Sequence, residues 1–145
     1  MKTGLLLPAL LLATACSPKA VWVDKAWIRL PAVPGQPGAA YFVVHGASGR
    51  DETLVGLSTP SAAKSEMHES MTGDRGMMAM APLREFVIPA SRDVAFAPGG
   101  KHVMLYSIKP DVKPGSTVKL TLLFMGGKIA TTDAKVVGAG ADAPE

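Results

Sequence analysis

The amino-acid sequence predicts an all-β protein, either an antiparallel sandwich or a small barrel. After residue 16, no segment shows the 3.6-residue periodicity of an amphipathic helix. The chain is punctuated along its length by 15 glycines and 12 prolines. Short runs of β-branched or alternating apolar residues lie between these breaks, which is typical of sandwiches built from many short strands.

Eight runs are predicted to be strands, and turns rich in proline and glycine separate them. Segments such as Pro98–Lys101 and Lys113–Ser116 carry the residues that tight connections need. Together the runs define one folded domain over residues 20–137, and residues 138–145 read as a tail. The predicted strands are Ala20–Leu30, Ala39–His45, Thr53–Leu57, Ala63–His68, Leu83–Ile88, His102–Ile108, Thr117–Phe124 and Lys128–Val137.

The N-terminus has the pattern of an export signal. A lysine near the start precedes an apolar run that ends at Ala13 and is too short to span a bilayer as a mature helix. Small residues follow up to Cys16, the only cysteine, so we predict cleavage after Ala15 and a lipid on Cys16. The alternative is an ordinary signal peptidase site with an incidental cysteine. In either case residues 1–15 are the signal and the domain is extracytoplasmic. Residues 17–19 are predicted to be a tether.

Charge and motifs exclude several classes of function. Without the signal, the 14 remaining basic residues exceed the 12 acidic ones by only two, and they are dispersed along the chain. Nucleic-acid binding is therefore not expected. The sequence holds no nucleophile elbow, no H-E-x-x-H motif and no close carboxylate pair in an apolar setting, so an enzyme is not expected either.

The stretch of residues 66–80 holds five of the eight methionines, together with His68. So many thioethers in a polar, glycine-broken stretch exceed what a core needs for gap-filling. Met67 alternates with His68 and is predicted to face the core. The remaining methionines are predicted to lie in a loop that follows a strand ending near His68.

A second histidine lies beside a methionine farther along the chain. His102 and Met104 follow a Pro-Gly-Gly turn and begin an apolar strand. Because strand side chains alternate, both point to one face and Val103 points to the other. With His68 and one loop methionine they would supply two imidazoles and two thioethers, which favour Cu(I) over Zn(II), Ca(II) or Mg(II). A blue-copper electron carrier needs a thiolate, which the folded domain lacks.

These residues resemble the signature of the periplasmic copper chaperones called PCu(A)C. That signature is a histidine, ten residues, a methionine, twenty-one residues and then His-x-Met. Met80 and His102 are separated by twenty-one residues here, and His102-Val103-Met104 completes the pattern. The passages DKAWIRLPAVPGQPGAAYFVV and APGGKHVMLYSIKPDVKPGSTVKLTLLF are also similar to that family, and the resemblance covers roughly residues 20–125.

The first gap of the signature departs from the family pattern. Eleven residues separate His68 from Met80, which we interpret as a one-residue insertion around Thr72–Arg75. The flanking Met-x-Met-x-Pro-hydrophobic passage supports Met80 as the ligand, and Met78 is the alternative. Three methionines of the stretch fit either an auxiliary copper role or an apolar docking patch equally well. These auxiliary candidates are Met71, Met77 and Met78.

The resemblance implies a Greek-key, cupredoxin-like β-sandwich that binds one Cu(I) per chain through His68, Met80, His102 and Met104. It also implies a monomeric chaperone that delivers copper toward the binuclear copper site of cytochrome c oxidase, directly or through a thioredoxin-like copper chaperone. Two alternatives stay open from sequence. One is a metal-free exported docking or assembly module, and the other is a protein for copper storage or detoxification.

Overall fold

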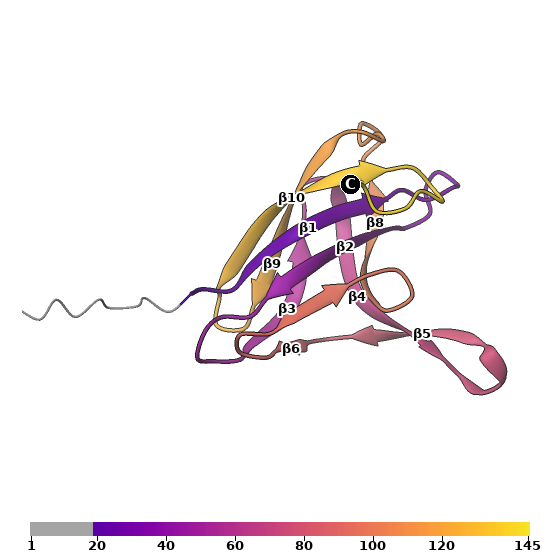
Figure 1. Cartoon of the computed structure of the whole chain (residues 1–145). Helices are drawn as coiled ribbons and strands as arrows, with labels where there is room; N and C mark the ends of the chain where they lie inside the picture. The colour runs from indigo at the N-terminus through magenta and orange to yellow at the C-terminus, as the bar shows by residue number, and fades with distance from the viewer. Residues whose placement is uncertain (1–18) are drawn as a thin grey trace, which may run out of the picture.

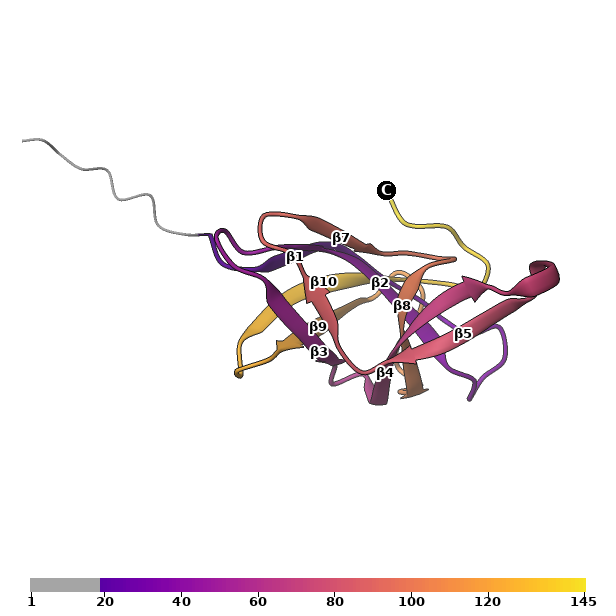
Figure 2. The ribbon, with the colours of Figure 1, turned by 90° about the horizontal axis from the view of Figure 1, so that it is seen from below.

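The computed structural model describes residues 19–145, except for the side chain of Asp74. The predicted signal and Cys16 lie outside the described residues. Within residues 19–145 there are ten strands, one short 3-10 turn (η1, Asp74–Gly76) and no α-helix, so the all-β prediction is confirmed. The strands in Figures 1 and 2 are β1 (Trp22–Arg29), β2 (Gly38–His45), β3 (Glu52–Ser58), β4 (Ala62–Thr72), β5 (Met78–Leu83), β6 (Phe86–Ile88), β7 (Asp93–Phe96), β8 (Lys101–Ile108), β9 (Thr117–Phe124) and β10 (Ile129–Val137).

The described strands form one strongly curled sheet. Its order is β5-β4-β8-β2-β1-β10-β9-β3-β6, and β7 pairs with β2 beside this path. Pairing is antiparallel except between β1 and β10. Ser65 of β4 donates a hydrogen bond to the carbonyl of Leu57 on β3, which brings together two strands that are distant in the sheet order. Figure 2 shows the resulting curl of the sheet.

The inner face of the curled sheet is apolar. Phe42 on β2 stacks on Phe96 of β7 with ring centres 4.6 Å apart, and Phe86 meets Phe96 edge-on at 6.3 Å. Met67 is 4% exposed, so the prediction that it faces the core is confirmed. The other large side chains that are fully buried are Ile28, Val44, Leu54, Ile88, Val103, Leu105, Leu120, Leu122, Phe124 and Val136.

The prediction of a loop after His68 is wrong. β4 continues to Thr72, and the chain returns as β5, so most of residues 66–80 form a β-hairpin with its turn at residues 73–77. The backbone N–H of Gly73 donates to the carbonyl of Met77 at 2.7 Å and closes the turn. Alanine is depleted in strands, so the sequence of β5 carries little strand signal, and the pairing with β4 decides its conformation. The hairpin projects from the body on the side away from the N-terminal end (Figures 1 and 2).

Two other strand predictions need correction. The predicted strand Leu83–Ile88 is wrong as a single element, because β5 ends at Leu83 and β6 begins at Phe86 and pairs with β3. The intervening residues carry the chain from the β4 side to the β3 side of the curl. No strand is predicted from sequence over β7, which has only four residues and begins with an aspartate.

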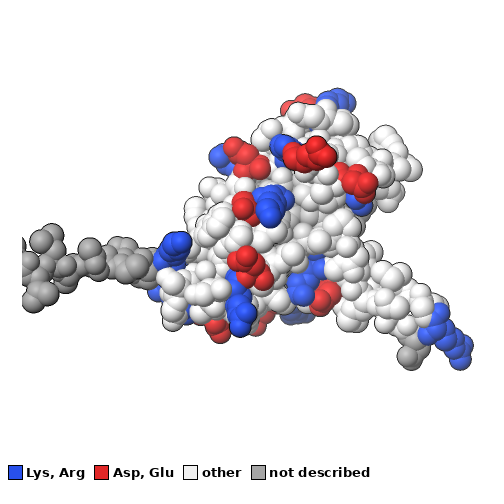
Figure 3. All heavy atoms as spheres, viewed as in Figure 1, with Lys and Arg blue, Asp and Glu red and all other residues white. Residues whose placement is uncertain are grey.

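The surface is mixed in charge, as the small net charge suggests. Figure 3 shows basic and acidic side chains interspersed over the body, whereas the stem of the projecting hairpin carries few of either. The predicted tail packs on the body, because Arg29 donates to the carbonyl of Ala141 at 2.9 Å and Lys135 donates to that of Glu145 at 2.6 Å. Among residues 19–145, no helix has the length and apolar character that crossing a membrane requires.

His45, at the end of β2, connects β1 and β7 through polar contacts. Its two ring nitrogens lie 2.8 Å from Asp24 and 2.7 Å from Asp93, and its ring stacks on Trp22 with centres 3.8 Å apart. Carboxylates only accept, so both contacts are hydrogen bonds only when the ring is protonated. Burial lowers the pKa of His45, but the bonds to Asp24 and Asp93 outweigh it and raise the pKa above its ordinary value of 6.5.

We therefore expect His45 to stabilise the fold most at low pH. Because the pKa is higher in the folded than in the unfolded chain, the contribution is complete below about pH 6.5 and is lost as the pH rises through the folded-state pKa. Urea unfolding of the wild type and of His45→Gln at pH 5.5 and pH 8.5 checks this. The difference in unfolding free energy should be larger at pH 5.5, and an equal or larger difference at pH 8.5 would contradict the assignment.

Candidate metal centre

His68 and His102 are direct cross-strand neighbours. His68 lies on β4 and His102 on β8, and their Cα atoms are partners in the antiparallel register. Their ring centres are 6.0 Å apart and the ring planes are inclined by 47°. Imidazole nitrogens bind metal ions at about 2.0 Å, so two rings that share one ion have centres roughly 5–6 Å apart. The observed separation of the two rings therefore fits a single shared ion.

The His102 ring is held by the turn that precedes its strand. Gly99 adopts a positive φ of 81°, and the N–H of Gly100 donates to the carbonyl of Ala97 at 3.0 Å, which closes the turn. The carbonyl of Gly100 then accepts a hydrogen bond from Nδ1 of His102 at 2.9 Å. A carbonyl only accepts, so Nδ1 carries a proton, and Nε2 is the nitrogen that can offer a lone pair. The ring, only 5% exposed, is thus oriented to bind a metal ion through Nε2.

His68 has a buried nitrogen without a hydrogen-bond partner. Within the described part of the chain, Nδ1 of His68 is inaccessible to solvent and no protein group bonds to it. Its other nitrogen, Nε2, lies 3.6 Å from a carboxylate oxygen of Glu66, which is beyond hydrogen-bond distance. A buried polar atom left unpaired is costly. A bound metal ion would satisfy this nitrogen.

Two methionines flank the histidine pair on the same face of the sheet. Met104 is the Cα partner of Glu66, one row to one side of the pair, and Met80 is the partner of Ser70, one row to the other side. Glu66, His68 and Ser70 alternate with residues of the opposite face, so all of these side chains share one face. Met104 is half-buried, whereas Met80 is 58% exposed. The strands β5, β4 and β8 therefore present Met80, the histidine pair and Met104 together.

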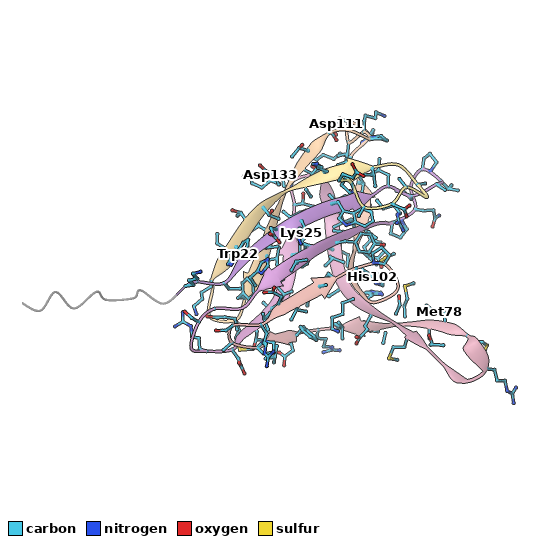
Figure 4. The ribbon with its side chains drawn as sticks, in the orientation of Figure 1. Trp22, Lys25, Met78, His102, Asp111 and Asp133 are labelled. Atoms are coloured by element: carbon cyan, nitrogen blue, oxygen red, sulfur yellow. The ribbon has the colours of Figure 1, made fainter. Side chains whose placement is uncertain are left out.

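The remaining methionine candidates occupy different positions. Met78 pairs with Thr72 on the same face as Met80 but two residues farther from the body. Met71 pairs with Ala79 and points to the opposite face. Met77 lies in the hairpin turn and is 68% exposed. Figure 4 shows Met78 out on the hairpin and His102 near the point where the hairpin leaves the body.

The donors available at this place are soft. Over the residues that the structure describes, no three side chains among histidine, cysteine, aspartate and glutamate converge on a position for a metal ion. Glu66 is the carboxylate beside His68, but Lys64 lies 2.7 Å from it. The hydrogen bond from Lys64 and a further one from Tyr106 lower the pKa of Glu66. A metal bound here would depend on imidazole and thioether donors, which suit Cu(I).

Comparison with known proteins agrees with the fold described above. The family model described as "Putative lipoprotein LpqE-like" matches residues 21–136. The chain belongs to the LpqE-like family. The LpqE-like chain is 30% identical over 107 residues to "Putative lipoprotein Lxx21020" of Leifsonia xyli subsp. xyli. That alignment covers 74% of the chain and 63% of the relative, so the chain spans less than two thirds of this relative's length.

Two solved structures resemble the LpqE-like chain. The solution structure of CuI-DR1885 from Deinococcus radiodurans is 28% identical with a TM-score of 0.56, over 83% of this chain and 76% of that one. The copper-bound PCuAC domain from PmoF2 has a TM-score of 0.68 at 23% identity, over 83% of this chain and 94% of that one, and shows likeness of fold alone. The resemblance to PCu(A)C proteins and the cupredoxin-like β fold are confirmed.

Sequence reasoning missed the groups that orient the LpqE-like chain's histidines. The alternation rule brings His102 and Met104 to one face, but it says nothing of the Gly100 carbonyl that holds Nδ1 of His102. It also does not reveal the cross-strand register that sets His68 opposite His102, because the pairing of β4 with β8 joins segments more than thirty residues apart. The glycine pair before His-x-Met is the one sequence signal for the turn whose carbonyl holds the His102 ring.

Proposed function

We propose that this protein is an extracytoplasmic Cu(I) chaperone that holds one ion through His68, Met80, His102 and Met104. The observation that carries the proposal is the cross-strand histidine pair, in which Nε2 of His102 can offer a lone pair and His68 keeps a buried, unpartnered Nδ1. Met80 and Met104 lie on the same face in the adjacent rows. All four donors are neutral when the histidines are deprotonated, which matches a monovalent soft ion.

The exposure of the site supports a carrier rather than a closed structural site. His102 is 5% exposed and Met80 is 58% exposed, so one side of the donor set is fixed and the other is open to a partner. Thioethers need no deprotonation, so an incoming ligand can replace Met80 without any proton transfer. The likeness to CuI-DR1885, which by its name holds Cu(I), supports the choice of metal. No catalytic role is proposed for these residues.

The same protein would work outside the cytoplasm, anchored to a membrane by lipid. The LpqE-like family and the relative Lxx21020 both carry "lipoprotein" in their names, which supports export and a lipid on Cys16. The hairpin projects on the side away from the N-terminal end, so an anchor at Cys16 would leave the donor set free to meet a partner (Figures 1 and 2). We propose a monomer in the periplasm whose acceptor is the binuclear copper site of cytochrome c oxidase or a thioredoxin-like copper chaperone.

Direct transfer tests the delivery function. Cu(I)-loaded protein is mixed anaerobically with the copper-free domain that carries the binuclear site, or with a copper-free thioredoxin-like chaperone. The proteins are then separated and their copper is measured. We expect copper to move to at least one acceptor faster than it dissociates into a solution without acceptor. Copper that stays with the protein in both mixtures would refute delivery to these acceptors and favour storage.

A metal-free docking module is the competing function, and one observation favours it. The hairpin exposes Met71, Met77, Met78 and Met80 by 50–68%, which leaves four apolar side chains accessible to a partner. Such a module would bind its partner equally well in the presence of bathocuproine disulfonate, a Cu(I) chelator. The chaperone would instead lose its copper to that chelator in a competitive equilibrium.

A further inference from the structure

The open face of the hairpin carries a second thioether beyond the candidate site. Met78 and Met80 are alternate residues of β5, so their side chains share the face of His68. The hydroxyl of Thr72 lies 3.7 Å from the sulfur of Met78, which confirms that this sulfur is over the same face. Met78 is 65% exposed. A row of soft donors thus runs from the histidine pair toward the hairpin turn.

The spacing of this row separates its members into inner and outer positions. Strand residues rise by about 3.4 Å, so Met80 lies about 7 Å and Met78 about 14 Å along β5 from Pro82, the partner of His68. Met80 can reach the ion beside the histidines because methionine is long and flexible. Met78 is too far along the strand to share that ion, but it is the next neighbour of Met80.

We propose that Met78 is an outer, transient Cu(I) ligand through which the ion is handed to a partner that presents its own thioether, thiolate or imidazole donors. This inference rests on the proposed function and adds the route of transfer. In the step, a Cu–S bond to Met78 forms while Met80 remains bound and the bonds to the histidine nitrogens break. Copper stays Cu(I), and no electron or proton is exchanged.

The structure also supplies a matched control. Met71 lies on the same hairpin, is 50% exposed and pairs with Ala79, but its side chain is on the opposite face. Met→Leu changes approximately keep side-chain volume and apolar character and remove the thioether. A general effect of hairpin apolarity would appear in both variants, whereas a ligand role predicts an effect for Met78 alone.

Self-exchange between copies of the protein tests the route without an identified acceptor. Unlabelled Cu(I)-loaded protein is mixed anaerobically with copper-free protein labelled with ¹³C at its methionine methyl groups, and the loading of the labelled copy is followed by NMR at several concentrations. The part of the loading rate that rises with protein concentration reports direct transfer between copies. The part that does not depend on protein concentration reports release of copper to solution. Bathocuproine disulfonate competition measures the affinity of each variant.

We expect Met78→Leu in both copies to lower the second-order rate constant by about tenfold, which is about 1.4 kcal/mol on the barrier. Its equilibrium affinity should stay within about twofold of the wild type, and Met71→Leu should change neither quantity. Equal rates for the two variants would overturn the route. A loss of affinity in Met78→Leu as large as that in Met80→Leu would overturn it too, because Met78 would then be a resident ligand. Wild-type protein that binds no Cu(I) would instead remove the proposed function itself.

Discussion

Replacing His102 with alanine is expected to weaken Cu(I) binding by at least about a hundredfold. Changing a residue that only supports a metal ligand costs about ten- to a hundredfold in affinity, and loss of a ligand held by its own hydrogen bond should cost no less. His102 is buried, and the Gly100 carbonyl holds its ring, so no other donor replaces it without backbone movement. The measurement is anaerobic competition with bathocuproine disulfonate.

His45→Gln is the matched control for this prediction. His45 is the third histidine of the chain and pairs with Asp24 and Asp93 at the N-terminal end of the sheet. Its replacement should leave the copper affinity within about twofold, and His68→Ala should behave like His102→Ala. Retention of wild-type affinity by both His68→Ala and His102→Ala would place the metal elsewhere or nowhere.

Replacing Phe42 with alanine is expected to destabilise the fold by about 3–5 kcal/mol. The ring is 1% exposed and stacks on Phe96, so its removal leaves a cavity where the curled sheet packs on itself. In a domain of this size, the loss corresponds to a fall in Tm of about 10–15 °C. Thermal unfolding followed by circular dichroism measures it. Met71→Ala, at a half-exposed hairpin position, should change the unfolding free energy by no more than about 0.5 kcal/mol.

A small effect at Phe42 would contradict this description of the core. If Phe42→Ala cost as little as Met71→Ala, the packing of β7 across β2 would contribute little to stability. The Cα atoms of Phe42 and Phe96 are partners in that pairing, and both side chains are buried.

The strands whose apolar residues alternate were predictable, and the projecting hairpin was not. In β9, Val118, Leu120, Leu122 and Phe124 are buried and alternate with more exposed residues, so local pattern suffices. β5 has the sequence MAMAPL, in which no residue is buried. Its conformation comes from pairing with β4, and that information is carried by contacts distant in sequence.

The part of the donor set that depends on local alternation was predictable from the sequence. His102 and Met104 are two residues apart on one strand, so alternation alone places them on one face. Alternation does not distinguish Met80 from Met78, because both lie on the same face as His68. The segment Thr72–Arg75, where we interpret the extra residue of the first gap, lies at the hairpin turn, and Met80 stands opposite Ser70, one row from the histidines. The hairpin register therefore favours Met80 by distance.

An anaerobic titration of the purified protein with Cu(I) in the presence of bathocuproine disulfonate tests the central claim most directly. We predict that the wild type withdraws one equivalent of Cu(I) from the chelator complex, with a sharp end point. Failure of the protein to withdraw any copper would contradict the copper-chaperone account and favour the metal-free docking module.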